Sequence, residues 1–108
     1  MAVLTVTPIT RAGTTITLVA ASAGGDTYDN STAPRLEVNN GSGSPITVYA
    51  AIYADGQTIV QGRAWVIAAG ARVRIAAMPG NYTNPADGKV SLTYSGVTTL
   101  TVGVYSDA

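Results

Sequence analysis

The sequence predicts an all-β protein, a single-domain antiparallel β-sandwich of jelly-roll type that spans residues 1–108. Apolar and polar residues alternate with a period of two in several runs, which is typical of strands with one buried face. Clusters of Gly, Pro, Asn and Asp separate these runs at intervals of roughly 8 to 12 residues, as in sandwiches and small barrels. A chain of 108 residues suffices for one modest hydrophobic core.

The runs amount to seven or eight short strands. An early strand, one long early loop and a strand at the very end of the chain favour the jelly roll. An immunoglobulin-like sandwich is the alternative. The chain has no Cys, so the Cys-Trp-Cys pattern of antibody domains is missing.

The first third of the chain predicts two strands and a loop. Residues 1–7 form the first strand, which Pro8 ends because proline cannot donate to a sheet ladder. Residues 14–20 form the second strand, with Ile16, Leu18 and Ala20 on one face. Residues 22–34 lack apolar periodicity and are rich in Gly, Asp and Asn, so they are expected to form the longest loop.

The middle of the chain predicts two strands and a weak third. Residues 35–39 place Leu36 and Val38 inward, so the intervening Glu37 is expected to face solvent or a partner. Residues 46–52 alternate again and end at a turn formed by Asp55-Gly56. Residues 57–60 are expected to form a short edge strand.

The last third predicts two hairpins. Residues 63–68 and 71–76 flank Ala69-Gly70; the rival Ala-rich helix is disfavoured by Gly70 and the β-branched residues. Residues 86–105 read as a closing hairpin joined at Ser95-Gly96. Its inward faces are expected to comprise Val90, Leu92 and Tyr94 on the first strand and Leu100, Val102 and Val104 on the second.

Charged residues make up 11% of the chain and the net charge is zero. An ordinary soluble domain has about 25% charged residues. A surface with so little charge repulsion suits a protein that packs against other protein. The alternative is a free surface made polar by Thr, Ser, Asn and Gly.

Residues that perform catalysis are scarce. The chain contains no His and no Cys, so the commonest general base, the commonest metal ligand and thiolate chemistry are all missing. Asp55 and Asp87 each precede a Gly, which is a turn signature, and the other acidic residues show no paired spacing. We expect no enzyme activity and no catalytic residue.

We expect no cofactor, no metal and no nucleic-acid partner. Residues 26–30 (DTYDN) offer oxygen ligands for a hard cation, but they lack the spacing of a calcium loop. The sequence offers few positive charges that could cluster on one face: Arg63, Arg72 and Arg74. A chain with a pI near 6.0 has little general attraction to the phosphates of a nucleic acid.

We also expect no membrane contact. The chain begins without the apolar stretch of a signal peptide, and no apolar run approaches the length of a membrane span. A soluble protein made in a cytoplasm is therefore expected.

Several segments together resemble a known group of proteins. They are residues 4–8 (LTVTP), 38–41 (VNNG), 68–71 (AAGA), 78–82 (MPGNY) and 87–98 (DGKVSLTYSGVT). This combination, which extends over nearly the whole chain, is similar to small virion structural proteins of tailed bacteriophages and prophages. The motifs are turn and strand patterns, and no catalytic residue carries over.

The resemblance implies a capsid decoration or cementing protein that binds the major capsid protein lattice in many copies. It implies a location on the capsid surface of the virion, after assembly in the host cytoplasm. A homotrimer is the expected self-assembly, because closed symmetry suits local threefold sites of a lattice. A tail or connector component is the nearest alternative.

Candidate contacts with such a partner lie in the N-terminal arm, the loop at 22–33 and the segment at 81–85, chosen for loop length and polarity. They are Val3, Leu4, Thr5, Asp26, Tyr28, Asp29, Asn81, Tyr82 and Thr83. A second functional hypothesis is a module that binds carbohydrate or a host surface. In that case Trp65, Tyr28 and Tyr82 would stack on sugar rings.

Overall fold

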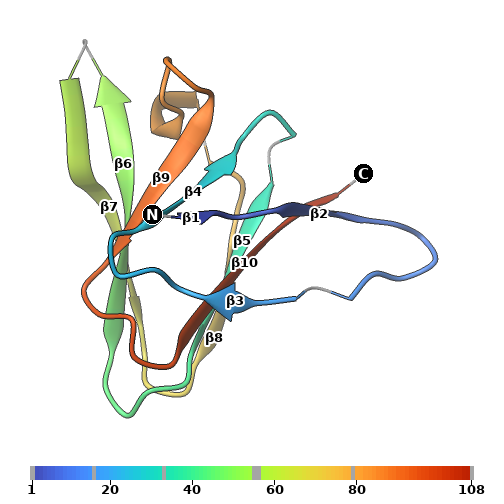
Figure 1. Ribbon diagram of the computed structural model, residues 1–108, viewed down its shortest axis with the longest axis vertical. Helices are drawn as coiled ribbons and strands as arrows, with labels where there is room; N and C mark the ends of the chain where they lie inside the picture. The colour runs from blue at the N-terminus through green and yellow to red at the C-terminus, as the bar shows by residue number, and fades with distance from the viewer. Residues whose placement is uncertain (1, 16, 33, 55–56, 79, 108) are drawn as a thin grey trace.

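A computed structural model describes residues 2–15, 17–32, 34–54, 57–78 and 80–107. The predicted all-β fold is confirmed: strands form two sheets that pack face to face (Figure 1). The molecule measures 20 Å along its shortest axis, as expected for two sheets about 10 Å apart with their outer side chains. The predicted Ile16 and the predicted turn at Asp55-Gly56 lie outside the described residues.

The described strands and one 3₁₀ turn follow one another along the chain. They are β1 (Ala2–Val3), β2 (Val6–Ile9), β3 (Val19–Ala20), β4 (Asp26–Asp29), β5 (Arg35–Asn40), β6 (Ile46–Ala54), β7 (Gln57–Ile67), β8 (Arg72–Ile75), η1 (Gly80–Tyr82), β9 (Lys89–Tyr94) and β10 (Leu100–Asp107).

The strand order is that of a jelly roll. One sheet has the order β1-β4-β9-β6-β7, and the other has β2-β10-β5-β8, with β3 also paired to β10. If β1 and β2 are set aside, β3 to β10 form two antiparallel four-stranded sheets, β3-β10-β5-β8 and β4-β9-β6-β7. Most successive strands therefore alternate between the two sheets, as in a jelly roll. This order differs from the immunoglobulin arrangement.

Both predicted hairpins in the last third are wrong, although their strands exist. β9 pairs with β4 and β6, whereas β10 pairs with β5 in the opposite sheet. β7 and β8 also belong to different sheets. The alternation identified the buried faces, with Val90, Leu92 and Val102 completely buried, but it carries no information about which strand lies alongside.

The true hairpin is β6–β7. β7 is 11 residues long and joins the two segments predicted separately at 57–60 and 63–68. Gly62 of β7 leaves room for the side chain of Ile52 on β6, because a Cβ at position 62 would overlap that side chain. A register shift between Ala50 and Ile52 lies beside it.

The predicted long loop at 22–34 contains a strand, which corrects that prediction. Asp26 and Tyr28 of β4 have no exposed surface, and they alternate inward opposite Leu92 and Val90 of β9. The apolar alternation is hidden in the sequence because one of the two inward positions is a carboxylate.

The N-terminal segment changes sheets. β1 runs parallel to β4 in one sheet, and β2 runs parallel to β10 in the other (Figure 1). Leu4, between these two strands, is buried. The strand predicted at 1–7 is therefore two strands, and Pro8 lies within the second one, on a sheet edge where no amide proton is needed. Among the described residues of the strand predicted at 14–20, only Val19–Ala20 form a strand.

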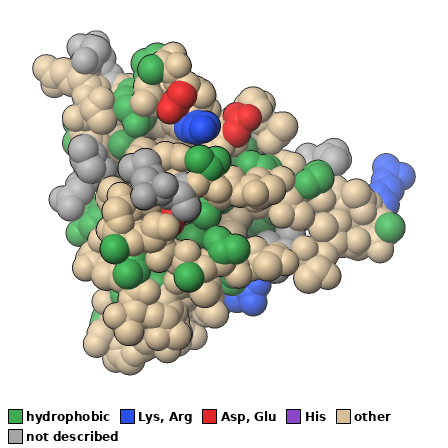
Figure 2. Space-filling view, viewed as in Figure 1, with side chains coloured by type: hydrophobic (Ala, Val, Ile, Leu, Met, Phe, Trp, Pro, Cys, Tyr) green, Lys and Arg blue, Asp and Glu red, His purple; other side chains and the backbone are tan. Residues whose placement is uncertain are grey.

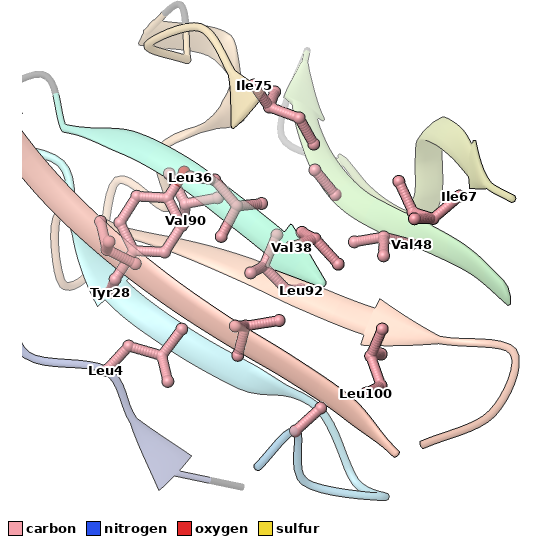
Figure 3. Packing of buried hydrophobic residues seen from close by; sticks show 14 of the residues in the cluster. Leu4, Tyr28, Leu36, Val38, Val48, Ile67, Ile75, Val90, Leu92 and Leu100 are labelled. Carbon is pink, nitrogen blue, oxygen red and sulfur yellow. The ribbon is translucent and has the colours of Figure 1, made fainter. Parts of the chain in front are cut away.

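The core lies between the two sheets, and its described residues are aliphatic except for Tyr28 and Met78. Leu36 and Val38 of β5 face Val90 and Leu92 of β9 across the sandwich (Figure 3). The cluster continues toward β7 through Val48 and Ile67 and toward the N-terminal segment through Leu4.

Candidate functional site

The two flanks of the sandwich differ. The N-terminal segment covers one flank, because it pairs with β4 in one sheet and with β10 in the other. At the opposite flank the sheets end in β7 and β8, and in the part of the chain that the structure describes neither strand has a neighbour on its outer edge. Such edges leave backbone N–H and C=O groups free to pair with another chain.

A groove of about 410 Å³ lies between these two edge strands. Its apolar lining comes from β7, β8 and the segment that follows β8. The apolar residues with the largest side chains are Trp65, Val73, Ile75, Met78 and Tyr82. The exposed side chains of Arg63 and Arg74 also line the groove, and no acidic residue does so among the described residues.

Arg63 and Trp65 reach the groove because of the register of β7. They lie opposite Ala50 and Val48, whose side chains are completely buried, so both point to the inner side of the sheet. At an edge strand this inner side opens onto the flank. The Arg63 guanidinium lies over the Trp65 ring, 5.8 Å from its centroid, within the range of a cation–π contact. The stacked guanidinium keeps N–H groups directed outward in its plane.

Arg74 belongs to an ion cluster on the outer face of the other sheet. Its Nε donates to Oε1 of Glu37 at 2.7 Å, and Arg72 donates to Oε2 of the same carboxylate through Nε at 2.8 Å and through Nη2. Glu37 is 1% exposed, so the expectation that it faces solvent is wrong. The alternation placed it on the outer face correctly, but the two arginines of β8 cover it.

This cluster determines the protonation of Glu37. Burial of the carboxyl raises its pKa, but the hydrogen bonds and positive charges of Arg72 and Arg74 outweigh burial, so the net pKa is below its ordinary value. The same contact raises the pKa of Arg74. The side chains of Glu37 and Arg74 therefore both remain charged at neutral pH.

The segment between β8 and β9 carries Tyr82 into the groove. Asn30, directly after β4, donates from Nδ2 to the carbonyl of Met78 at 3.3 Å and to the Thr83 hydroxyl at 2.8 Å. Met78 itself is buried in the core. These contacts fix both ends of the 3₁₀ turn, which places Tyr82 beside the groove.

A second surface is the outward face of the β6–β7 hairpin, defined here as Ile59, Gly62, Ala64 and Val66 of β7 with Ile52 of β6. Val66 is 71% exposed and Ile59 is 51% exposed. The five residues carry no charge. Charged side chains are also few on the face of the molecule that Figure 2 shows.

A polar cluster lies inside the sandwich. Oδ2 of Asp26 accepts a hydrogen bond from the Tyr94 hydroxyl at 2.7 Å and from the Ser22 amide at 3.1 Å. Oδ1 of Asp26 and the Tyr28 hydroxyl are buried without a hydrogen-bond partner among the described residues. Burial raises the pKa of Tyr28, and burial together with the Asp26 hydrogen bond raises that of Tyr94.

The nine residues predicted as partner contacts do not form one surface. Leu4, Asp26 and Tyr28 are buried, which removes their side chains from the exposed surface of this chain. Val3 and Asp29 line a shallow hollow of about 350 Å³ beside the N-terminal segment, and Thr5 is exposed nearby. Three predicted residues lie on the segment after β8, beside the opposite flank: Asn81, which is exposed, and Tyr82 and Thr83, which are partly buried.

The sequence interpretation missed the groove because it lies between two strands that were expected to form a hairpin. A signal was present in the alternation of Arg63 and Trp65 on one face and of Arg72 and Arg74 on another. The sequence does not show that the inner face of β7 opens onto the same flank as β8. That placement depends on the sheet each strand joins.

Within the described ranges, no three acidic side chains gather closely enough to hold a metal ion. No helix in that part of the chain has the length and apolarity needed to cross a bilayer. No family model, curated protein or solved structure matches this chain.

Proposed function

We propose that this protein is a non-enzymatic structural component of a tailed-bacteriophage particle, a decoration protein that binds the capsid lattice in many copies. The observation that carries the proposal is the outward face of the β6–β7 hairpin, an uncharged surface with Val66 and Ile59 largely exposed. Exposed aliphatic side chains on a long edge strand are typical of a surface that other protein covers. The jelly roll adds support by analogy, since viral capsid domains use it.

The mechanism we propose is energetic. A decoration protein bridges neighbouring capsid subunits, and the area buried by each bridge must be exposed again before the shell opens. Many copies allow each contact to be weak, because linked contacts act through a high effective concentration. A surface with few charges suits this role, since few ions have to be desolvated when it is covered.

The test compares particles assembled with and without this protein. Particles that lack it should release DNA at a lower temperature, and adding the purified protein should restore the original release temperature. The variant Val66→Lys should fold normally but fail to restore it, because a buried, unpaired ammonium opposes binding. Ala12→Lys, at an exposed position between β2 and β3, is the matched control and should restore it fully.

Two results would count against a cementing role: an unchanged release temperature without the protein, or full activity of Val66→Lys. Recovery of the protein with purified tails and not with heads would move the assignment to a tail or connector component.

A second candidate function is a module that binds carbohydrate or a host surface. The structure brings Trp65 and Tyr82, two of the three aromatic residues expected to stack on sugars, to one groove. Tyr28, the third, is in the core and takes no part. A panel of neutral oligosaccharides titrated against Trp65 fluorescence tests this candidate, which requires a saturable change that Tyr82→Ala weakens.

A further inference from the structure

The open flank combines three properties. Two strand edges, those of β7 and β8, are free of pairing among the described residues. The groove between them has an apolar lining that includes Trp65, Ile75 and Met78. Its two charged side chains, Arg63 and Arg74, have the same sign.

The charges of the groove are only partly compensated. Arg74 uses its Nε for Glu37, and its only other interactions found among the described residues are electrostatic. Arg63 stacks on the Trp65 ring, a contact that leaves the N–H groups in the guanidinium plane free for an acceptor. A ligand with a carboxylate therefore complements the groove, and a cationic ligand does not.

The backbone that borders the groove indicates the shape of the ligand. Six consecutive residues, 73–78, line it, so the edge of β8 and of the segment after it borders the space along its length. A strand placed there can pair with the free edge of β8, which is the geometry of β-strand addition. Alternate side chains of the added strand would then point toward Trp65 and Ile75.

The opposite flank shows the same kind of contact within this chain. There an extended segment, β1 to β2, lies along the edges of both sheets and inserts Leu4 between them. The fold therefore already closes one flank with an extended chain that packs apolar side chains, Leu4 and Val6, against the core.

We propose that the groove between β7 and β8 binds an extended acidic segment of a partner protein, which adds a strand to β8 and places a carboxylate against Arg63 and Arg74. An apolar side chain of the same segment occupies the space beside Trp65, Ile75 and Met78. This inference concerns the inner side of the flank and does not depend on the capsid proposal, which rests on the outward face of the β6–β7 hairpin.

The test uses defined peptides and the protein's own fluorescence. Trp65 is the only Trp of the chain, so its emission reports on this groove alone. The probes are eight-residue peptides of alternating Val and Thr, acetylated and amidated, in which Asp replaces one Thr at successive positions. At least one Asp peptide should give a saturable change in emission, and its Asn counterpart should bind about tenfold more weakly.

Variants locate the binding. Arg63→Gln and Arg74→Gln should each weaken the best Asp peptide by about tenfold, measured by calorimetry because Arg63→Gln also alters the surroundings of the indole. Arg63→Lys should restore part of the affinity, since it keeps the charge but loses the planar fork. Arg11→Gln, on the exposed turn after β2, is the control and should bind normally.

The outcomes separate the alternatives. Equal binding of Asp and Asn peptides, or normal binding by both groove variants, would overturn the proposal. Saturable binding of an oligogalacturonate in the absence of peptide binding would assign the groove to an acidic saccharide. Amide shifts in a ¹⁵N spectrum should concentrate at residues 72–78 when the peptide binds; shifts confined to the β6–β7 outward face would overturn strand addition at β8.

Discussion

The hydroxyl of Tyr94 donates a 2.7 Å hydrogen bond to Asp26, and this contact joins the inner faces of β9 and β4. The Asp26 side chain has no exposed surface. A buried carboxylate is unfavourable unless hydrogen bonds compensate for lost hydration. Tyr94 and the Ser22 amide supply that compensation, and they explain why a polar residue occupies an inward position of β4.

Tyr94→Phe should lower the free energy of unfolding by about 1–3 kcal/mol, because it leaves the buried Asp26 carboxylate with only the Ser22 amide as donor. Urea denaturation at pH 7 measures the change. Tyr49→Phe is the control; Tyr49 lies on the outward side of β6, and its replacement should change stability by less than about 0.5 kcal/mol. Equal effects of the two substitutions would contradict the structural role of the Tyr94–Asp26 contact.

Stability should fall as the pH rises above about 10. The pKa values of Tyr28 and Tyr94 are both raised in the folded protein, chiefly by burial. Above the ordinary tyrosine pKa the unfolded chain loses these protons while the folded chain keeps them, so each residue lowers the unfolding free energy by about 1.4 kcal/mol per pH unit. Denaturation from pH 8 to pH 11 measures the slope, which should be shallower in Tyr94→Phe.

Glu37→Gln should lower the unfolding free energy at pH 7 by about 1 kcal/mol, a modest figure because solvent screens the partly exposed Arg72 and Arg74. The pKa of Glu37 is lowered on folding, so its contribution is present above the unfolded pKa of about 4.3 and is lost as the pH falls through the folded value. The difference between wild type and variant should therefore shrink from pH 6 to pH 2. A constant difference across that range would rule out the ion cluster as its source.

Leu4→Ala should cost about 2–5 kcal/mol, because Leu4 is 5% exposed where the chain crosses between the sheets. Its neighbour Val3 is 62% exposed, so Val3→Ala should cost less than about 1 kcal/mol. Thermal or urea unfolding of both variants measures the contrast. Similar small losses would show that the N-terminal segment is not an integral part of the core.

Gly25→Ala should destabilise the protein by at least about 2 kcal/mol more than Gly13→Ala. Both glycines have a positive φ, +97° and +91°, which an alanine adopts only with strain. At Gly25 a Cβ would also overlap the backbone carbonyl oxygen of Leu92, whereas at Gly13 it would meet open space. Gly13→Ala therefore reports the cost of the backbone conformation alone, and the additional loss in Gly25→Ala reports the cost of the clash. The unfolding midpoints of the two variants measure these costs.

The sequence predicted the fold class and most buried faces because a period of two depends only on the strand itself. Val90 and Leu92 on β9, like Leu100 and Val102 on β10, are buried as the alternation indicates. Strand pairing depends instead on which sheet a strand joins. Ser95-Gly96 resembles a tight turn, yet the chain there crosses from one sheet to the other.

The buried polar residues could not be predicted, because their partners are distant in sequence. Asp26 meets Tyr94, 68 residues away, and Glu37 meets Arg72, 35 residues away. Without these partners a carboxylate indicates a loop or a solvent-facing position, as the sequence interpretation assumed for both. The groove could not be predicted from the sequence for the same reason. Arg63 and Arg74 line one groove only because the jelly-roll order places β7 and β8 at the same flank.

The parallel pairing of β2 with β10 also affects how the protein would respond to mechanical force. Val6 lies opposite Val104 and Ile9 opposite Asp107, so the two strands run side by side in the same direction. A pull that separates residue 2 from residue 107 would slide these strands past one another and load their hydrogen bonds together. Hydrogen bonds loaded together in shear resist a larger force than hydrogen bonds that break one at a time. The β2–β10 pair should therefore resist tension applied between residues 2 and 107.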